Sequence, residues 1–466
     1  MKFYQTGKRF IAILCAVLLF SGLSFGCQKA EQHQKIWIFC DWNAEGPFQG
    51  TYRITEKEVF LNYISYLTEL PKEDIVLEFL PLENSERSAR LSALRTEIMA
   101  GGGPDVFFLS CSLPGWGAGF QKAATSFDVS SNYEIAERLF PDVQAAMGNK
   151  IFLPLDDRIK NASWLDISLL TPTLLNAGKT EEGQQVLPIT VTFPITVYEQ
   201  ESGELKPSQK IEQHSLAVAA KQQFADLFGQ LADYSQNNLL FSKKELLDTV
   251  KHNLMLDKQY LSDKADSDGF LTQYFLSYCD MGEWNYQDYD LQPEQKTGLQ
   301  DFCPVQNTEG GVTAAVTAYA GVNRNTKHPE SAFRIVEFLF RDDVQTALGR
   351  NTMISWGRCE DSLEETEREL QTFLLAGCYG VPVRGDLMQD WKHSFCQRNL
   401  HDPNAAEMFS KYTALRNEVT HARFYGALDA ELQAMYEACL EAKTDEEIEK
   451  IVSKAYDTME MILAES

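Results

Sequence analysis

The sequence is short of positive charge. Its 466 residues contain 42 lysines and arginines against 67 aspartates and glutamates, a formal net charge of −25 at pH 7. A nucleic-acid-binding protein needs a basic face to meet the phosphates, so this balance argues against that class. Charge of this kind keeps a protein soluble and carries no information about its fold.

Common catalytic and metal-binding motifs are also missing. The sequence contains no GxSxG, no HExxH and no glycine-rich phosphate loop followed by lysine. Its ten cysteines include no CxxC pair and no Cys/His cluster at zinc spacing, which favours mostly free thiols, with one or two bridges as the alternative. The acidic pairs Asp156-Asp157 and Asp342-Asp343 fit helix starts. We therefore expect no catalytic residue, no cofactor and no metal.

One apolar run marks the amino terminus as a targeting segment. Lys2, Lys8 and Arg9 precede the run Phe10–Gly26, and Cys27 follows it. This is the layout of a secretory signal peptide, and the run is too short and too asymmetrically flanked for a transmembrane helix. We predict a signal peptide at 1–26 and a polar tether at 27–34.

The mature chain alternates strand and helix patterns. Apolar strand patterns at 36–42, 74–82 and 106–109 are separated by two helical patterns, which predicts a parallel α/β sheet. Because 466 residues exceed what one hydrophobic core serves, two lobes are expected.

The stretch "LRTEIMAGGGPDVFFLS" (94–110) explains how one helix meets the third strand. Leu91, Leu94 and Ile98 recur at helical spacing, and Gly101 can take the left-handed conformation that ends a helix. Ligands of doubly wound sheets bind beyond the carboxyl ends of the strands, which places Ser110 at such an edge. Asp105, at the start of the strand, is interpreted as a turn residue.

Several stretches together resemble one family. They are "LRTEIMAGGGPDVFFL", "IFLPLDDRIKN", "VLPITVTFPITVYEQ", "AYAGVNRNTKHPESAFRIVEFLFRDDVQ", "VPVRGD" and the helical tail from Ala405. In this order they resemble the bacterial extracellular solute-binding proteins of ABC importers, in particular the sugar-binding group that includes maltose-binding protein. The chain departs from the family at Tyr198-Glu199, where tyrosine-asparagine is usual, and 202–301 matches weakly.

The resemblance implies an α/β, two-lobed periplasmic-binding-protein-like fold with a ligand cleft between the lobes and a helical C-terminal tail. It predicts lobe 1 at 35–191 plus 312–350 and lobe 2 at 192–311 plus 351–466. The lobes would move about crossing segments near 191–194 and 311–315. It also implies a monomeric, non-enzymatic protein that delivers a carbohydrate, of oligosaccharide size, to ABC permease subunits. The sequence before Cys27 resembles a lipobox, so Cys27 would be acylated and tether the protein to the extracytoplasmic face of the cell membrane; simple cleavage or an uncleaved anchor is the alternative.

A sugar site needs flat aromatic rings for the C–H faces of the ligand and polar groups for its hydroxyls. Residues of these types at strand ends and in loops are the predicted ligand contacts, and each tryptophan among them has a core or lobe-surface position as its alternative. They are Asp41, Trp42, Ser110, Ser112, Trp116, Thr192, Trp284 and Trp356.

Two other functions stay open at this point. A binding protein for a polyamine, a peptide or an organic anion would share the fold, and a polyamine site would concentrate carboxylates. A secreted carbohydrate-active enzyme would need two carboxylates about 5–10 Å apart.

Overall fold

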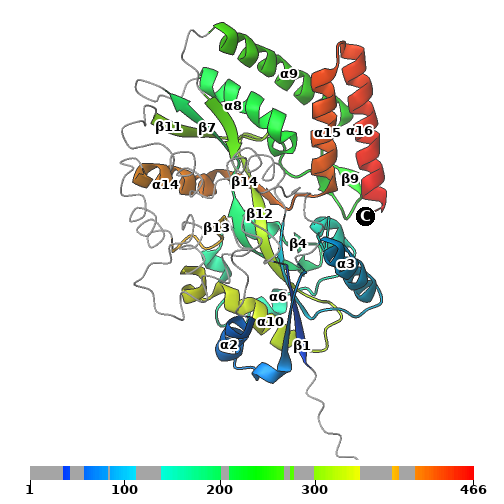
Figure 1. The fold of residues 1–466 in the computed structure, drawn as a ribbon, viewed down its shortest axis with the longest axis vertical. Helices are drawn as coiled ribbons and strands as arrows, with labels where there is room; N and C mark the ends of the chain where they lie inside the picture. Colours follow the sequence, from blue (N-terminus) through cyan, green and yellow to red (C-terminus); the bar gives the residue numbers. More distant parts are fainter. Residues whose placement is uncertain are drawn as a thin grey trace, which may run out of the picture.

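The computed structural model describes residues 35–41, 57–81, 84–111, 138–200, 209–266, 273–277, 299–346, 380–387 and 405–465. Their buried side chains form two hydrophobic clusters, one around a large mixed sheet and one among helices near the carboxyl end. In Figure 1 the sheet region lies below and the helical region above, with a long strand running up between them. We call these regions the first and the second lobe.

The sheet of the first lobe contains seven described strands. Six form a path in which neighbours are hydrogen-bonded, and the seventh pairs with the third of them. In spatial order the path is β13 (Val381–Pro382), β6 (Val186–Thr192), β12 (Val312–Val322), β3 (Val106–Ser110), β1 (Ile36–Cys40) and β2 (Ile75–Phe79), and β14 (Val419–Arg423) pairs with β12.

The direction of these strands decides which ends meet. β1 runs parallel to β2 and β3, whereas β12 runs antiparallel to both β3 and β6. The carboxyl ends of β1, β3 and β6 therefore lie at one edge. Every residue of β3, β6 and β12 is buried, as expected for strands covered on both faces.

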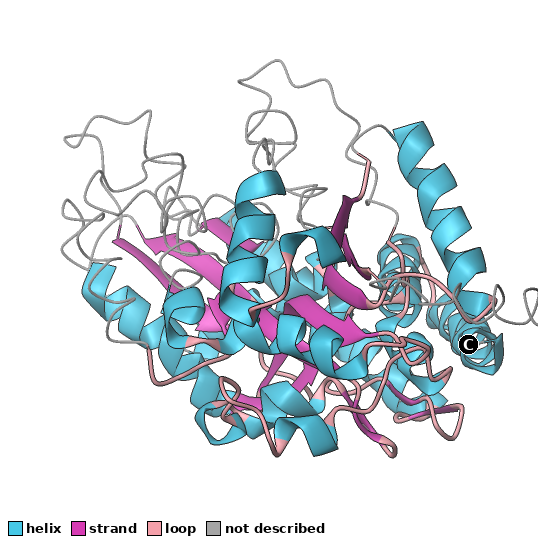
Figure 2. Cartoon of the chain, turned by 90° about the horizontal axis from the view of Figure 1, so that it is seen from below, coloured by secondary structure: helices cyan, strands magenta, loops and turns pink. Residues whose placement is uncertain are grey.

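Helices cover this sheet, and Figure 2 shows the strands in the interior with helices around them. Among them, α2 (Lys57–Thr68) packs against β2, and α10 (Pro329–Glu337) packs against β12 and β3. The remaining elements of this lobe are η2 (Lys72–Asp74), α3 (Asn84–Met99), α5 (Val143–Gly148), α6 (Asp156–Ile159), η4 (Ile167–Leu169), α7 (Pro172–Asn176), β4 (Lys179–Thr180), β5 (Gly183–Gln184) and η8 (Phe338–Phe340).

The turn from α3 to β3 follows the sequence prediction. Leu91, Leu94 and Ile98 are buried, and Gly101 has a φ of 82° at the end of the helix. The Asp105 carboxylate accepts hydrogen bonds from the Trp37 amide at 2.8 Å and from Thr326 Oγ1 at 2.5 Å. Asp105 therefore fixes the turn to the sheet, as interpreted from the sequence.

The second lobe places helices over a small antiparallel sheet. That sheet has the described order β10 (Gln273–Ser277), β7 (Ile195–Gln200) and β11 (Leu299–Pro304), and α8 (Gln209–Gln222) packs against it. The other elements of this lobe are η5 (Phe224–Leu227), the hairpin strands β8 (Ala232–Asp233) and β9 (Asn238–Leu239), α9 (Lys243–Asp266), α15 (Ala427–Glu441) and α16 (Asp445–Glu465). α9, α15 and α16 lie side by side at the top and right of Figure 1.

Two connections between the lobes run close together. β6 continues into β7 after Thr192, and β11 continues into β12 before Val312. The Val305 amide donates to the Pro194 carbonyl at 2.9 Å, so the two connections are hydrogen-bonded where they cross. β13 and β14, from the range 351–466, pair with the first sheet; the full division of the chain between the lobes stays a prediction.

The carboxyl-terminal region is helical with one interruption. α14 (Ala405–Ala414) and η9 (Leu415–Glu418) precede β14, which joins the first sheet as a strand that the helical pattern did not predict. His214, near the middle of α8, is only 8% exposed. The four described cysteines, Cys40, Cys111, Cys303 and Cys439, are buried and form no disulfide, as expected.

Two methionines of α16 test the packing of this helix. Met459 is fully buried in the second cluster, whereas Met461 is 62% exposed. We expect Met459→Ala to lower the free energy of unfolding by about 2–5 kcal/mol, because it leaves a cavity. Met461→Ala should change it by less than about 0.5 kcal/mol. Urea denaturation of both variants measures this, and equal effects would contradict the described helix face.

Candidate functional site

The carboxyl edge of the first sheet brings three of the predicted ligand contacts onto neighbouring strands. Asp41 directly follows β1, Ser110 ends β3 and Thr192 ends β6. Ser110 and Thr190 both pair with Ala318 on β12, one from each side, so the end of β3 lies level with Thr190, two residues before the end of β6.

Asp41 and Ser110 form a buried polar pair at this edge. Asp41 is 1% exposed and Ser110 is 2% exposed. One carboxylate oxygen of Asp41 accepts hydrogen bonds from the Ser110 amide at 2.8 Å and from Ser110 Oγ at 3.0 Å. Buried carboxylates need such donors, and two from one residue fix the orientation of Asp41.

Arg138 completes the cluster from a distant part of the chain. Its Nη1 donates to Ser110 Oγ at 2.9 Å and lies 3.7 Å from the second carboxylate oxygen of Asp41. The arginine side chain is 10% exposed. No sequence motif marks Arg138, which lies 28 residues beyond Ser110, and the sequence analysis did not predict it.

The charges of the cluster depend strongly on burial. Burial raises the pKa of Asp41 to about 6, against the opposing effects of Arg138 and Ser110. Burial lowers the pKa of Arg87, and the negative charge of Asp41 opposes that shift. One carboxylate thus lies in the field of two guanidinium groups. Buried ionisable groups with shifted pKa values are frequent at functional sites.

Threonine hydroxyls lie along the same edge. Thr190 Oγ1 and Thr317 Oγ1 are 2.8 Å apart and satisfy each other. Thr192, also fully buried, has an Oγ1 with no hydrogen-bond partner among the described residues. A buried hydroxyl without a partner is unfavourable for folding, which sets Thr192 apart from the paired hydroxyls of Thr190 and Thr317.

The remaining predicted contacts are not placed. Trp42, Ser112, Trp116, Trp284, Trp356 and the predicted lipidation residue Cys27 all lie outside the described residues. Their roles stay predictions.

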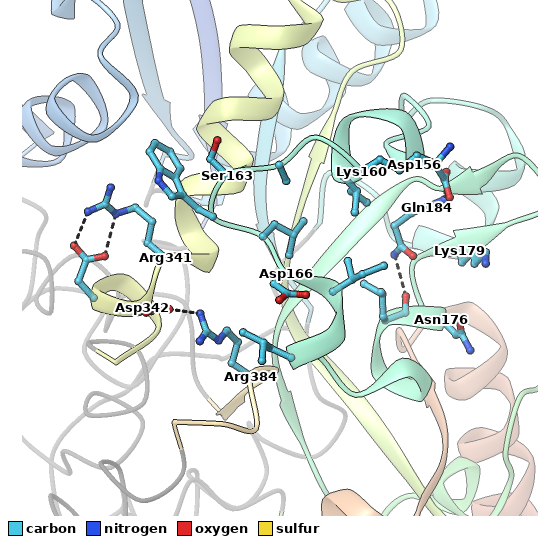
Figure 3. Close-up of a pocket in the computed structure, with 18 residues that line it drawn as sticks. Asp156, Lys160, Ser163, Asp166, Asn176, Lys179, Gln184, Arg341, Asp342 and Arg384 are labelled. Carbon is cyan, nitrogen blue, oxygen red and sulfur yellow. Dashed lines mark hydrogen bonds and ion pairs between the residues drawn. The ribbon is translucent and has the colours of Figure 1, made fainter.

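A pocket of about 1090 Å³ lies elsewhere, on the flank of the first lobe. Figure 3 shows Gln184 in its wall. Gln184 precedes β6 and Thr192 ends that strand, so this wall lies at the other end of β6 from the candidate site. Several of its charged groups are engaged with one another: Arg384 donates to Asp342 at 2.5 Å, and Arg341 Nε donates to Asp343 at 3.0 Å. We therefore assign the candidate site to the carboxyl edge.

The described residues carry no metal or membrane-spanning feature. They contain no group of three histidine, cysteine or acidic side chains placed to hold a metal ion. None of the described helices is both long enough and apolar enough to cross a membrane.

Solved structures of solute-binding proteins share this fold, while no protein-family model and no curated protein matches the sequence. The sugar-binding protein MalE from Xanthomonas citri has a TM-score of 0.54 and 12% identity, covering 93% of this chain and 98% of its own. An extracellular solute-binding protein of family 1 from Alicyclobacillus acidocaldarius has a TM-score of 0.50 and 13% identity, covering 92% and 98%. A de novo designed cysteine esterase has a TM-score of 0.53 and 12% identity, covering 93% and 98%. The chain therefore has the two-lobed periplasmic-binding-protein-like fold predicted from its sequence.

Asp41→Asn tests the buried ionisation. The pKa of Asp41 is about 6 in the folded protein against 3.8 ordinarily, so the folded state binds this proton more tightly than the unfolded chain. The stability of the parent relative to Asp41→Asn should therefore fall as the pH rises from about 4 to about 6, and then stay level. Two pH units correspond to about 3 kcal/mol.

Urea denaturation of parent and variant from pH 4 to pH 8 measures this difference. Asp157→Asn is the control, because a hydrogen bond from Lys160 lowers the pKa of Asp157, and its effect has the opposite sign. If the stability of the parent relative to Asp41→Asn instead rises with pH, Asp41 stays ionised in the folded protein over this range.

Proposed function

We propose that this protein is an extracytoplasmic binding protein that captures a carbohydrate, of oligosaccharide size, between its two lobes. The observation that carries the proposal is the polar cluster of Asp41, Ser110 and Arg138 at the carboxyl edge of the sheet. In open α/β sheets, ligands bind beyond this edge.

The chemistry of the cluster suits hydroxyl groups. Each sugar hydroxyl both donates and accepts a hydrogen bond. Asp41 supplies an acceptor, Arg138 supplies donors, and the unpartnered Thr192 hydroxyl supplies either. We expect Trp42, one residue beyond Asp41, and Trp116 to add the aromatic faces on which sugar rings stack.

Other solutes fit the described groups less well. A polyamine needs an excess of carboxylates, whereas Asp41 lies in the field of Arg138 and Arg87. The two arginines favour an acidic sugar or an organic anion as the second candidate.

We propose binding and not catalysis, and the reason lies in the side chains of the site, since a designed esterase has a similar fold. Hydrolysis of a glycoside uses two carboxylates on either side of the scissile bond. In the described part of the site, Asp41 is hydrogen-bonded to a serine and approached by an arginine. That arrangement holds a ligand and provides one carboxylate of the required pair.

Delivery to ABC permease subunits and a lipid anchor at Cys27 complete the proposal. Both rest on the resemblance of the sequence to the solute-binding family and on the signal-peptide layout of residues 1–27. A monomer held at the extracytoplasmic face of the membrane would capture solute there.

Ligand-dependent stabilisation tests the carbohydrate assignment. We expect maltotriose, mannotriose or digalacturonate to raise the melting temperature of the parent, whereas spermidine and citrate should not. A ligand at 100 times its dissociation constant adds about 2.7 kcal/mol of stability. Thr192→Val keeps the side-chain shape and removes the unpartnered hydroxyl. It should lower the affinity for whichever glycan binds about tenfold, as measured by titration calorimetry.

Thr458→Val is the matched control, because Thr458 Oγ1 is exposed on α16 and donates to the Lys454 carbonyl. It should bind the ligand like the parent. Stabilisation by spermidine or citrate alone would overturn the carbohydrate assignment. Equal affinity in the parent and in Thr192→Val would remove Thr192 from the site.

The anchor is tested by mass spectrometry of the protein purified from membranes. We expect a mature chain that begins at Cys27 and carries the added mass of acyl chains, and Cys27→Ser should release the protein into the soluble fraction. An unmodified Cys27 thiol, with cleavage at another residue, would contradict lipidation.

A further inference from the structure

The segment from Arg138 to Asp142 links the candidate site with the second lobe. At its first residue, Arg138 Nη1 donates to Ser110 Oγ at 2.9 Å. At its last residue, Asp142 Oδ2 accepts a hydrogen bond from the hydroxyl of Tyr234 at 2.6 Å. Five residues thus join a charged group of the site to a side chain of the other lobe.

The segment is held firmly between these ends. Arg95 on α3 donates through Nε to the Leu139 carbonyl at 3.0 Å, and its Nη2 donates to the Arg138 carbonyl. Leu139 is 1% exposed. The Phe140 ring packs edge-on against Phe107 and Phe152, with centroids 5.5 and 5.2 Å apart. Close packing transmits displacement because it leaves no free volume to absorb it.

Asp142 also organises the chain that follows. Its Oδ1 accepts the Ala145 amide at 2.9 Å and caps the start of α5, while Oδ2 is left for Tyr234. The two carboxylate oxygens therefore have separate duties, one within the first lobe and one toward the second.

Tyr234 belongs to the second lobe. It lies between β8 and β9, and its ring packs against the cluster formed by α9, α15 and α16. Burial, with the negative charge of Asp142 as a second cause, raises the pKa of the Tyr234 hydroxyl, so it stays a proton donor at neutral pH.

We propose that Tyr234 is a positioning residue that couples the placement of the second lobe to Arg138 in the candidate site. The role of that site rests on the function proposed above. When the second lobe moves, the hydrogen bond from Tyr234 displaces Asp142, and the packed segment 138–142 transmits that displacement to Arg138. The coupling is reciprocal, so a ligand that engages Arg138 also favours the lobe placement in which the Tyr234 hydrogen bond forms.

Hydrogen exchange of the ligand-free protein tests this coupling with two matched tyrosine variants. Tyr234→Phe removes the bond to Asp142. Tyr456→Phe removes a bond of the same kind that stays inside the second lobe, from Tyr456 to the Phe241 carbonyl at 3.2 Å. We expect Tyr234→Phe to speed exchange about fivefold in the peptide covering 138–148 and also in the peptide that contains the Ser110 amide. Tyr456→Phe should change neither.

Substitution of Asp142 gives the corresponding result from the first lobe. Asp142→Asn keeps one oxygen to cap α5, and its amide nitrogen can donate to the Tyr234 hydroxyl, so a hydrogen bond to Tyr234 remains and exchange near Ser110 should stay close to the parent rate. Asp142→Ala loses both bonds and should reproduce the Tyr234→Phe pattern.

Three results would overturn the proposal: parent-like exchange in Tyr234→Phe, faster exchange confined to the hairpin 232–239, or equal effects of the two tyrosine variants. Because no ligand is added, these results do not depend on which solute binds. A failure of every glycan to stabilise the protein would overturn the proposed function and leave the coupling result standing.

Discussion

β12 is the strand on which both the sheet and the site depend. Its eleven residues are all buried, and it pairs with β6, β3 and β14. At its start, Thr313 Oγ1 donates to the Phe228 carbonyl in the second lobe at 2.8 Å. A one-residue slip of this strand would turn its side chains to the opposite faces and shift the ends of β3 and β6 relative to each other. The geometry of the candidate site is therefore a consequence of the register of β12.

The polar cluster at this edge is costly for stability. A carboxylate removed from water loses its hydration, and the hydrogen bonds from Ser110 and the charge of Arg138 offset only part of that loss, since the pKa of Asp41 remains raised. An apolar side chain would pack at such a position without this cost. A buried charged pair of this kind agrees with the ligand-binding role proposed for this edge.

The sequence predicted features that depend on local patterns. The spacing of Leu91, Leu94 and Ile98, the glycine turn and the apolar strands predicted α3, β3 and the parallel order of β1, β2 and β3, and the family resemblance predicted the two-lobed fold. Long-range pairing was beyond those patterns. β14 lies in a mainly helical region and forms a strand through its parallel pairing with β12. Arg138 reaches Ser110 through tertiary packing, which no spacing in the sequence encodes.

The whole chain is strongly negative, whereas the candidate site contains positive side chains, and this difference affects which ligands can bind. A formal charge of −25 repels anions at long range, but salt screens such fields beyond about 8 Å at physiological ionic strength. Within the described site, Arg138 lies 3.7 Å from the Asp41 carboxylate, and the charge of Asp41 also acts on the pKa of Arg87. A neutral polyhydroxyl ligand would form hydrogen bonds with both the carboxylate and the guanidinium groups, and neither charge would repel it. An anion would have to displace Asp41 from its arginine, so the ion pair itself favours the neutral sugar.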